Sequence, residues 1–287
     1  MPPAPLRVLT LSSLFPSAAQ PLLGPFVLRQ TQALAHLPDT QVQVVAPLGL
    51  PPWPLSCLSR YRPRTRLPLR EDWQGVRIWR PRFRHWPGSD GRFDVGAMVR
   101  TLAPLLAHIR RQSPIDVLDA QYFFPDGPAA IALGRQLGVP VSIKARGSDI
   151  HYWGQRPGPA RMIKAAGLAA DGLLAVSAAL KADMVALGLP AGRIQVHPTG
   201  LDHAIFRPQP KAAARQVLGL TAPLIVSVGA LIPRKRQALI LNALVHLPGV
   251  QLALIGEGPD QPGLIALSKQ LGVEDRVLWA GPLPAAD

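Results

Sequence analysis

Short apolar runs alternate along the chain with segments in which apolar residues recur every three to four positions. Alternation of buried strands with amphipathic helices is typical of α/β chains with parallel sheets. The pattern therefore predicts an α/β fold. The expected strands cover residues 7–11, 42–46, 76–79, 117–120, 141–144, 172–176, 193–196, 224–228, 251–255 and 277–280.

Helix signals fall between most of these strands. Pro125-Asp126-Gly127 opens a helix that we expect to reach about Leu137. Ser177 is a natural N-cap for a later helix. A 3.6-residue period over residues 98–109 predicts a helix that kinks at Pro104 or begins near it.

Two regions interrupt the alternation. Residues 47–70 are rich in Pro, Arg and Leu without a clear period, and a loop of this length is typically functional or mobile. Residues 206–222 contain several prolines around a short Ala-rich stretch, which predicts a linker. We therefore expect a first domain over residues 1–205 and a second over residues 223–287.

The second domain has few elements. About three strands are expected in it, whereas a doubly wound domain usually has about five or six. The sequence therefore predicts that this domain is incomplete and that the chain is a fragment or a truncated product.

Charge narrows the classes of partner. The chain has 31 Lys and Arg against 17 Asp and Glu, for a formal charge of +14. A basic protein favours nucleic acid, acidic lipid surfaces or phosphorylated ligands, although genomic base composition is an equal explanation for the arginines. The arginines are dispersed and no nucleic-acid-binding motif occurs, so we expect no nucleic-acid partner.

Cysteine usage and hydropathy bear on the compartment. Cys57 is the only cysteine, so no internal disulfide can form and a reducing cytoplasmic setting is expected. The first residues lack the basic start and long apolar run of a signal peptide. No run of about 18 apolar residues predicts a membrane span, and attachment to a membrane surface stays open.

The clearest candidate for chemistry follows the strand at residues 224–228. Gly229 permits a tight turn there, and Arg234 and Lys235 come directly before a predicted helix. A helix N-terminus beside cations is a phosphate site, although the spacing of a Walker loop is absent. The alternative is a solvated basic cap, but basic residues usually favour the other end of a helix.

The next strand ends in a second glycine turn, formed by Gly256, Glu257 and Gly258. Ligands bind at the carboxyl ends of strands in open α/β sheets. An ordinary strand-to-helix turn explains these residues equally well.

In the first domain, Arg146, Gly147 and Asp149 follow a strand. Arg146 and Asp149 could form an internal ion pair that supports the loop, or they could face a polar substrate. The loop that contains Gly24 follows the first strand and should border the same crevice. The histidines are scattered and no Asp-x-Asp occurs, so we expect no metal site.

Several segments together resemble glycosyltransferase family 4, a group of GT-B type enzymes. The most specific are Tyr122-Phe123-Phe124-Pro125-Asp126-Gly127, Ala145-Arg146-Gly147-Ser148-Asp149, and the stretch from Val176 to Phe206. The resemblance covers nearly the whole chain. It implies two facing Rossmann-like, doubly wound domains, with the acceptor on the first and a nucleotide-sugar donor mainly on the second.

The resemblance also implies roles for residues. Lys235 would contact the donor diphosphate and stabilise the departing nucleotide, and Arg234 is an adjacent candidate. Such electrostatic stabilisation of developing charge can replace a metal ion, so no cofactor is expected. Arg146 and Asp149 would serve catalysis, with retention of anomeric configuration. Residues implied to approach the donor are Gly24, Gly147, Gly229, Gly256, Glu257 and Gly258.

Some positions depart from the family pattern. Ala230 stands where many relatives have a second phosphate-binding arginine, and Arg146 where many have a histidine. Thr199 replaces the usual asparagine. The acidic Glu-x7-Glu segment that holds the donor is expected after Asp287.

The function expected from this resemblance is transfer of a sugar to a saccharide or lipid-linked acceptor in cell-surface polysaccharide or glycolipid synthesis. It would occur in the cytoplasm, with an anionic membrane surface as a further partner. The competing hypotheses are a GT-B-fold sugar-nucleotide epimerase, a basic nucleic-acid-binding protein, and a non-catalytic remnant.

Overall fold

The structure is a computed structural model that describes residues 4–217 and 222–283. The chain divides into two compact units, Met1–Gly200 and Leu201–Asp287. Each unit has its own sheet, mostly parallel in the first and parallel in the second, and its own hydrophobic core. The expected linker at residues 206–222 falls partly outside the described residues.

The first unit is built on an eight-stranded sheet with the order β10-β9-β8-β7-β1-β2-β5-β4. Every neighbouring pair is parallel except β4 and β5, which form an antiparallel pair. A separate parallel pair joins β3 and β6. The strands are β1 Leu6–Leu11, β2 Thr40–Val45, β3 Leu48–Leu50, β4 Arg70–Trp73, β5 Val76–Trp79, β6 Arg82–Arg84, β7 Val117–Ala120, β8 Val141–Ala145, β9 Gly172–Ala175 and β10 Ile194–Val196.

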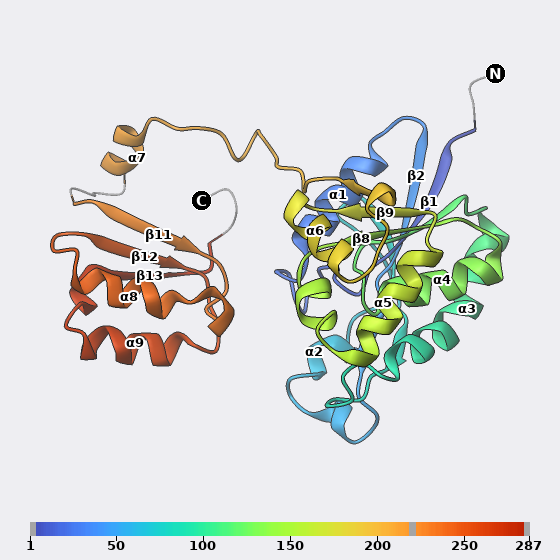
Figure 1. The fold of residues 1–287 in the computed structure, drawn as a ribbon, viewed down its shortest axis with the longest axis horizontal. Helices are drawn as coiled ribbons and strands as arrows, with labels where there is room; N and C mark the ends of the chain where they lie inside the picture. Colours follow the sequence, from blue (N-terminus) through green and yellow to red (C-terminus); the bar gives the residue numbers. More distant parts are fainter. Residues whose placement is uncertain (1–3, 218–221, 284–287) are drawn as a thin grey trace. The chain divides into compact units, whose positions relative to one another are not determined.

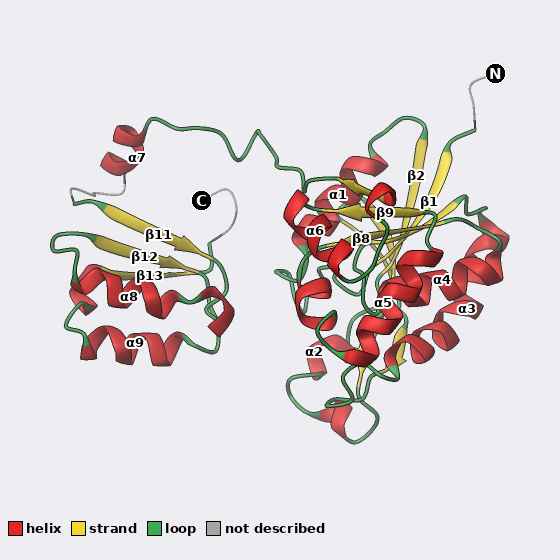
Figure 2. Cartoon of the chain, in the orientation of Figure 1, coloured by secondary structure: helices red, strands yellow, loops and turns green. Residues whose placement is uncertain are grey.

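Helices connect these strands and cover the sheet (Figure 2). The N-cap prediction is confirmed, because the Ser177 hydroxyl accepts the N–H of Leu180 at 3.1 Å. The helices are α1 Pro25–Ala35, α2 Arg62–Thr65, α3 Asp94–Gln112, α4 Asp126–Leu137, α5 Pro157–Ala169 and α6 Ala178–Ala186, with a π-helical turn η2 at Asp149–Trp153 and 3-10 turns η1 at Leu55–Cys57 and η3 at Ala191–Arg193.

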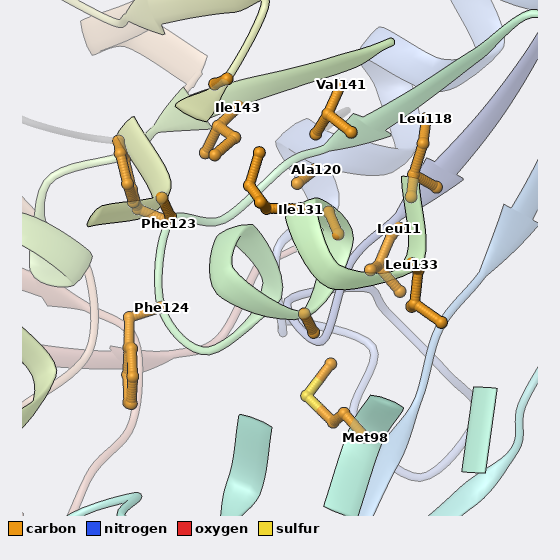
Figure 3. Packing of buried hydrophobic residues seen from close by; sticks show 14 of the residues in the cluster. Leu11, Met98, Leu118, Ala120, Phe123, Phe124, Ile131, Leu133, Val141 and Ile143 are labelled. Carbon is orange, nitrogen blue, oxygen red and sulfur yellow. The ribbon is translucent and has the colours of Figure 1, made fainter. Parts of the chain in front are cut away.

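Apolar packing buries both faces of the first sheet. Val44 and Val45 are neighbours in β2, and both are fully buried, yet they belong to different clusters because successive strand residues point to opposite faces. Val44 joins the cluster beside α1, which contains Val27. Val45 joins the larger cluster beside α3 and α4. Figure 3 shows part of that larger cluster, with Met98 of α3 below the α4 side chains.

The second unit has a three-stranded parallel sheet with the order β11-β12-β13. Helices α8 and α9 cover one of its faces (Figure 1). On β11, Val226 is 51% and Val228 71% exposed. Its elements are α7 Lys211–Val217, β11 Leu224–Val228, η4 Pro233–Lys235, α8 Gln237–Val245, β12 Gln251–Ile255, α9 Gln261–Gln270, η5 Glu274–Arg276 and β13 Val277–Gly281.

Two local expectations differ from the structure, and some elements were not expected. Helix α3 runs without interruption from Asp94 to Gln112 and therefore does not begin at Pro104, because apolar residues on both sides of the proline are buried on one face. Residues 47–70 are not one irregular loop, since they contain β3, η1 and α2. Helix α5 and the short strands β3, β4 and β6 were not expected at all. Within residues 4–217 and 222–283, every helix is too short or too polar to cross a bilayer.

Candidate functional site

The carboxyl ends of the parallel strands meet at one edge of the first sheet. Strand β1 lies between β2 and β7, so the strand order reverses beside it. Open α/β sheets bind ligands in the crevice at such a switch point. The loops after β1, β7 and β8 border this edge, and they carry most of the residues singled out in the first domain.

The Asp149 carboxylate organises the loop after β8. It is fully buried and accepts the backbone N–H groups of Phe123 at 2.8 Å, Gly147 at 2.7 Å and Arg146 at 3.0 Å. Burial raises the pKa of this carboxyl, while the backbone hydrogen bonds oppose that rise. The geometry therefore favours loop support over substrate contact for Asp149. Among the described side chains, no ion pair joins Asp149 to Arg146, so the support comes from the backbone N–H groups.

The Arg146 guanidinium turns instead towards two glutamines. It donates to the Gln121 carbonyl at 3.2 Å, to the Gln121 side chain, and to Oε1 of Gln30 at 3.0 Å. It also lies over the Phe26 ring at 5.2 Å, and it reaches Thr199 Oγ1 at 3.5 Å. Burial lowers the pKa of Arg146 to about 10. Arg146 is therefore a fixed, half-buried cation at the carboxyl edge.

A buried lysine adjoins Arg146 and was not predicted as a site residue. Lys144 is fully buried, and its Nζ donates to Oε1 of Gln30 at 2.9 Å and to Nδ1 of His197 at 2.6 Å. Burial, helped by the charge of Arg146, lowers the pKa of Lys144 to about 8. A lysine inside the apolar strand Val141–Ala145 was the available signal, because isolated charges are almost never buried without a partner.

Asp126 is a second buried carboxylate at the same edge. One of its oxygens accepts the N–H of Ser13 at 2.7 Å, and the other has no hydrogen-bond partner among the described residues. Burial raises the pKa of Asp126 to about 7. The group can therefore change protonation near neutral pH.

Two of the glycines expected near the donor lie in the first unit, and they differ in their surroundings. At Gly24 the backbone is left-handed, with φ 66°, and a Cβ would lie 2.3 Å from the Leu14 carbonyl oxygen. Gly24 therefore serves close packing within the chain. Gly147, with φ 120°, has open space where a Cβ would stand, so its backbone can be approached from outside.

In the second unit, the turns after β11 and β12 pack backbone to backbone. A Cβ on Gly256 would lie 2.2 Å from the Gly229 oxygen, and one on Gly258 would lie 2.2 Å from the Leu231 oxygen. The Leu231 N–H also donates to the Glu257 carbonyl at 2.9 Å. The structure thus joins the two glycine turns into one surface, beside a hollow of about 560 Å³ at the start of α9.

Three consecutive basic residues follow the first of these turns. Arg234, Lys235 and Arg236 are exposed and precede α8. The Lys235 side chain folds back, so that its Nζ lies 3.7 Å from the position of a Cβ on Gly229. Arg236 has φ 54°, an uncommon left-handed conformation for a residue with a side chain. Together they put positive charge at the carboxyl end of β11.

The predicted site residues thus form two sets, one in each unit. Among the described residues, no three His, Cys, Asp or Glu side chains are grouped closely enough to hold a metal ion. Sequence reasoning missed Gln30, Gln121, Lys144 and His197. It also missed Asp119, the buried carboxylate in β7 that accepts hydrogen bonds from the Gln121 amide and the Ser142 hydroxyl.

Comparison with known families decides the assignment. Residues 26–205 match Glycosyltransferase Family 4, and residues 209–287 match Glycosyl transferases group 1. The chain belongs to glycosyltransferase family 4. The resemblance expected from the motifs is thereby confirmed.

Similar proteins of this class include two bacterial glycosyltransferases. The chain is 30% identical over 179 residues to the GDP-mannose-dependent alpha-(1-6)-phosphatidylinositol monomannoside mannosyltransferase of Mycolicibacterium smegmatis. The matched region covers 59% of this chain and 47% of that relative. It is 27% identical over 263 residues to the teichuronic acid biosynthesis glycosyltransferase TuaC of Bacillus subtilis, and this match covers 88% of this chain and 66% of that relative. The chain thus spans about half to two thirds of the length of these two relatives.

Solved structures share the fold. Anabaena HepE in complex with UDP and glucose aligns over 98% of this chain and 70% of its own, with a TM-score of 0.65 and 19% identity. A UDP-N-acetylglucosamine 2-epimerase from Listeria monocytogenes aligns over 99% of this chain and 71% of its own, with a TM-score of 0.59 and 14% identity. The likeness confirms the expected GT-B type fold, and the family match separates this chain from the epimerases.

Proposed function

We propose that this glycosyltransferase moves a sugar from a nucleotide-sugar donor to a saccharide or lipid-linked acceptor in cell-surface polysaccharide or glycolipid synthesis. The observation that carries the proposal is the position of Lys235 over Gly229, at the carboxyl end of β11. A cation beside a glycine turn and a helix N-terminus suits a diphosphate. The UDP named with HepE and the GDP-mannose named with the mycobacterial relative have this chemistry.

The donor chemistry follows from the charges. When the sugar leaves, negative charge develops on the nucleotide diphosphate, and Lys235 with Arg234 would stabilise it electrostatically. We therefore propose transfer without a metal or other cofactor. We further propose retention of anomeric configuration, which rests on the family alone. Gly229, Gly256, Glu257 and Gly258 would let the backbone approach the donor.

In the first unit we propose that Arg146 faces the reacting sugar and Asp149 positions the loop. Arg146 is only half-buried, whereas every described contact of the Asp149 carboxylate is a backbone N–H. Gly147 is the open backbone position between them, and Gly24 shapes the neighbouring turn.

We also propose that the protein works in the cytoplasm at an anionic membrane surface. Residues 51–70 contain five arginines and no acidic residue. Within this segment, Trp53 is 80%, Leu69 60% and Leu58 46% exposed. Arginines interleaved with exposed apolar groups suit a surface of anionic lipid. Co-sedimentation with vesicles of phosphatidylglycerol should weaken in a Trp53→Ser, Leu58→Ser variant, and unchanged binding would contradict this placement.

Isothermal titration with a panel of UDP- and GDP-sugars tests the proposed function. We expect either the UDP-sugars or the GDP-sugars to bind the 287-residue chain. Oligonucleotides should bind only through non-specific charge attraction, which weakens as the salt concentration rises. Binding of oligonucleotides without any nucleotide sugar would favour the nucleic-acid alternative instead.

A further inference from the structure

A second hollow lies in the first unit, outside the residues discussed so far. It has a volume of about 600 Å³, and residues of the segments 89–92 and 156–162 line it. Small-molecule sites commonly have volumes of about 300–1,000 Å³. We call it the arginine hollow, after Arg92, Arg156 and Arg161, which all contribute to its lining.

The charge of the arginine hollow is unbalanced. The three arginines face one carboxylate, Asp90, which pairs with Arg156 at 3.1 Å. Among residues 4–217 and 222–283, neither Arg92 nor Arg161 forms a salt bridge. Arg161 donates its Nε–H to the Pro157 carbonyl at 3.3 Å, and the Arg92 guanidinium lies 5.6 Å from the centre of the Phe93 ring. The terminal NH2 groups of both arginines have no described hydrogen-bond partner and can bind an anion.

Arg156 is held in a fixed orientation. Its NH1 group donates to the Tyr152 carbonyl at 2.9 Å, and the guanidinium lies 3.6 Å from the centre of the Tyr152 ring. The Trp153 ring is 5.5 Å away. A guanidinium fixed in this way loses little further freedom when it binds a ligand.

The first turn of α5 adds to the positive potential. The helix begins Pro157-Gly158-Pro159, and neither proline has an N–H group. Gly158 supplies the N–H of that turn, and nothing lies within 4 Å of where its Cβ would stand. The helix dipole reinforces the arginines at this position.

The hollow is packed against the carboxyl edge of the first sheet. A Cβ on Gly91 would lie 2.7 Å from the Phe124 ring, and Phe124 lies 5.0 Å from Trp153 between ring centres. Phe124 follows β7, and Trp153 ends the π-helical turn that begins at Asp149 after β8. Such turns occur frequently at functional sites.

We propose that the arginine hollow binds a phosphate ester group of the acceptor substrate. Guanidinium groups recognise phosphate through paired, charge-assisted hydrogen bonds, which suits one fixed and two available arginines. The inference rests on the proposed function, because it places an anionic acceptor beside the loops of the acceptor unit. The phosphate belongs either to a soluble sugar phosphate or to a lipid headgroup.

The test uses the full chain with Lys235→Ala, which removes the competing phosphate site proposed in the second unit. Glucose 1-phosphate and glucose are titrated into this chain, and vesicles of phosphatidic acid or phosphatidylcholine form a second arm. We expect the phosphate-bearing probe of one arm to bind and its neutral counterpart not to bind. Arg92→Ala with Arg161→Ala should weaken binding at least about tenfold, as loss of charge-assisted hydrogen bonds predicts. The matched control is Arg100→Ala with Arg111→Ala, which removes the same charge from α3 and should change nothing.

Each outcome has one meaning. Binding of glucose 1-phosphate that the Arg92→Ala, Arg161→Ala variant weakens assigns a soluble acceptor. Binding of phosphatidic acid assigns a lipid headgroup when that variant weakens it and the control does not, because residues 51–70 are unchanged in both. If neither probe binds, or if both double variants behave alike, the arginine hollow is not a phosphate site. Titration of UDP- and GDP-sugars into the unmutated chain distinguishes a failure of this inference from a failure of the proposed function. Donor binding without phosphate binding in the arginine hollow contradicts only this inference.

Discussion

The Nζ of Lys144 lies 2.6 Å from Nδ1 of His197, across 53 residues of sequence. Because the ammonium group can only donate, His197 accepts this bond as a neutral ring with its proton on Nε2. The bond joins β8 to the residue that follows β10. It therefore ties the last strand of the first unit to the charged centre of its carboxyl edge.

Removing this acceptor should destabilise the first unit. His197→Ala would leave the buried Lys144 ammonium with Gln30 as its remaining described side-chain partner, at a cost of roughly 1–2 kcal/mol. His197→Asn should restore most of the loss, because its Oδ1 lies where Nδ1 lay. Urea unfolding, read by hydrogen exchange in β8, measures both variants. Equal stability of the alanine variant and the unmutated chain would show that the bond contributes nothing.

The same pair predicts a pH dependence. Burial, with the charges of Lys144 and Arg146, lowers the pKa of His197, although Asp119 opposes this. The unfolded chain therefore takes up a proton first as the pH falls below about 6.5. Neutral His197 contributes fully to the free energy of unfolding above that pH. The contribution is lost as the pH falls towards the lowered pKa of His197 in the folded chain. Unfolding between pH 8 and 5 should show this loss in the unmutated chain and a smaller one in His197→Asn.

Asp149→Asn should disorganise the loop after β8. The new amide places a donor against backbone N–H groups that now bind a carboxylate. We expect a loss of roughly 2–4 kcal/mol, since hydrogen bonds to a charged group contribute about 1.5–3 kcal/mol each. Hydrogen exchange should rise at residues 146–150, while the affinity for free UDP or GDP stays within about twofold, because the diphosphate site is proposed in the other unit. Unchanged exchange at these residues would contradict the positioning role.

Gly256→Ala should disrupt the joined turns of the second unit. Its φ of 135° is rarely adopted by other residues, and the new Cβ would meet the Gly229 oxygen at 2.2 Å. Overpacking of this kind typically costs about 1–3 kcal/mol. The control is Gly263→Ala in α9, where nothing lies within 4 Å of the new Cβ and helix propensity improves. Exchange of the β12 amides should increase in the first variant only.

Periodicity and turn residues were enough to predict the α/β fold, the start of α4 and every described strand except the short strands β3, β4 and β6. The signals there are local, as in the Pro125-Asp126-Gly127 turn. Helix α5 escaped prediction because its Pro157-Gly158-Pro159 opening looks like a loop in sequence. Helix α3 continues through Pro104 because packing of its buried face outweighs the local cost of a proline.

The candidate site residues also divide into those that short sequence motifs predict and those that only the fold brings together. Lys235 and the glycine turns lie in short motifs, so the sequence points to them directly. Gln30, Lys144 and His197 meet only through the tertiary fold, which brings α1, β8 and the end of β10 together. No spacing in the sequence encodes that meeting. Asp149 is buried and Arg146 only half-buried, although only two residues lie between them in the chain.

The central claim is that the turn surface under Lys235 binds a nucleotide diphosphate. Isothermal titration of Lys235→Ala against the unmutated chain, with the best nucleotide sugar of the panel, tests it most directly. The matched control is Lys269→Ala, at the far end of α9. The account predicts that Lys235→Ala weakens binding roughly 10- to 100-fold, as loss of a charge-assisted contact implies, while Lys269→Ala leaves it unchanged. Equal affinities for all three proteins would contradict it.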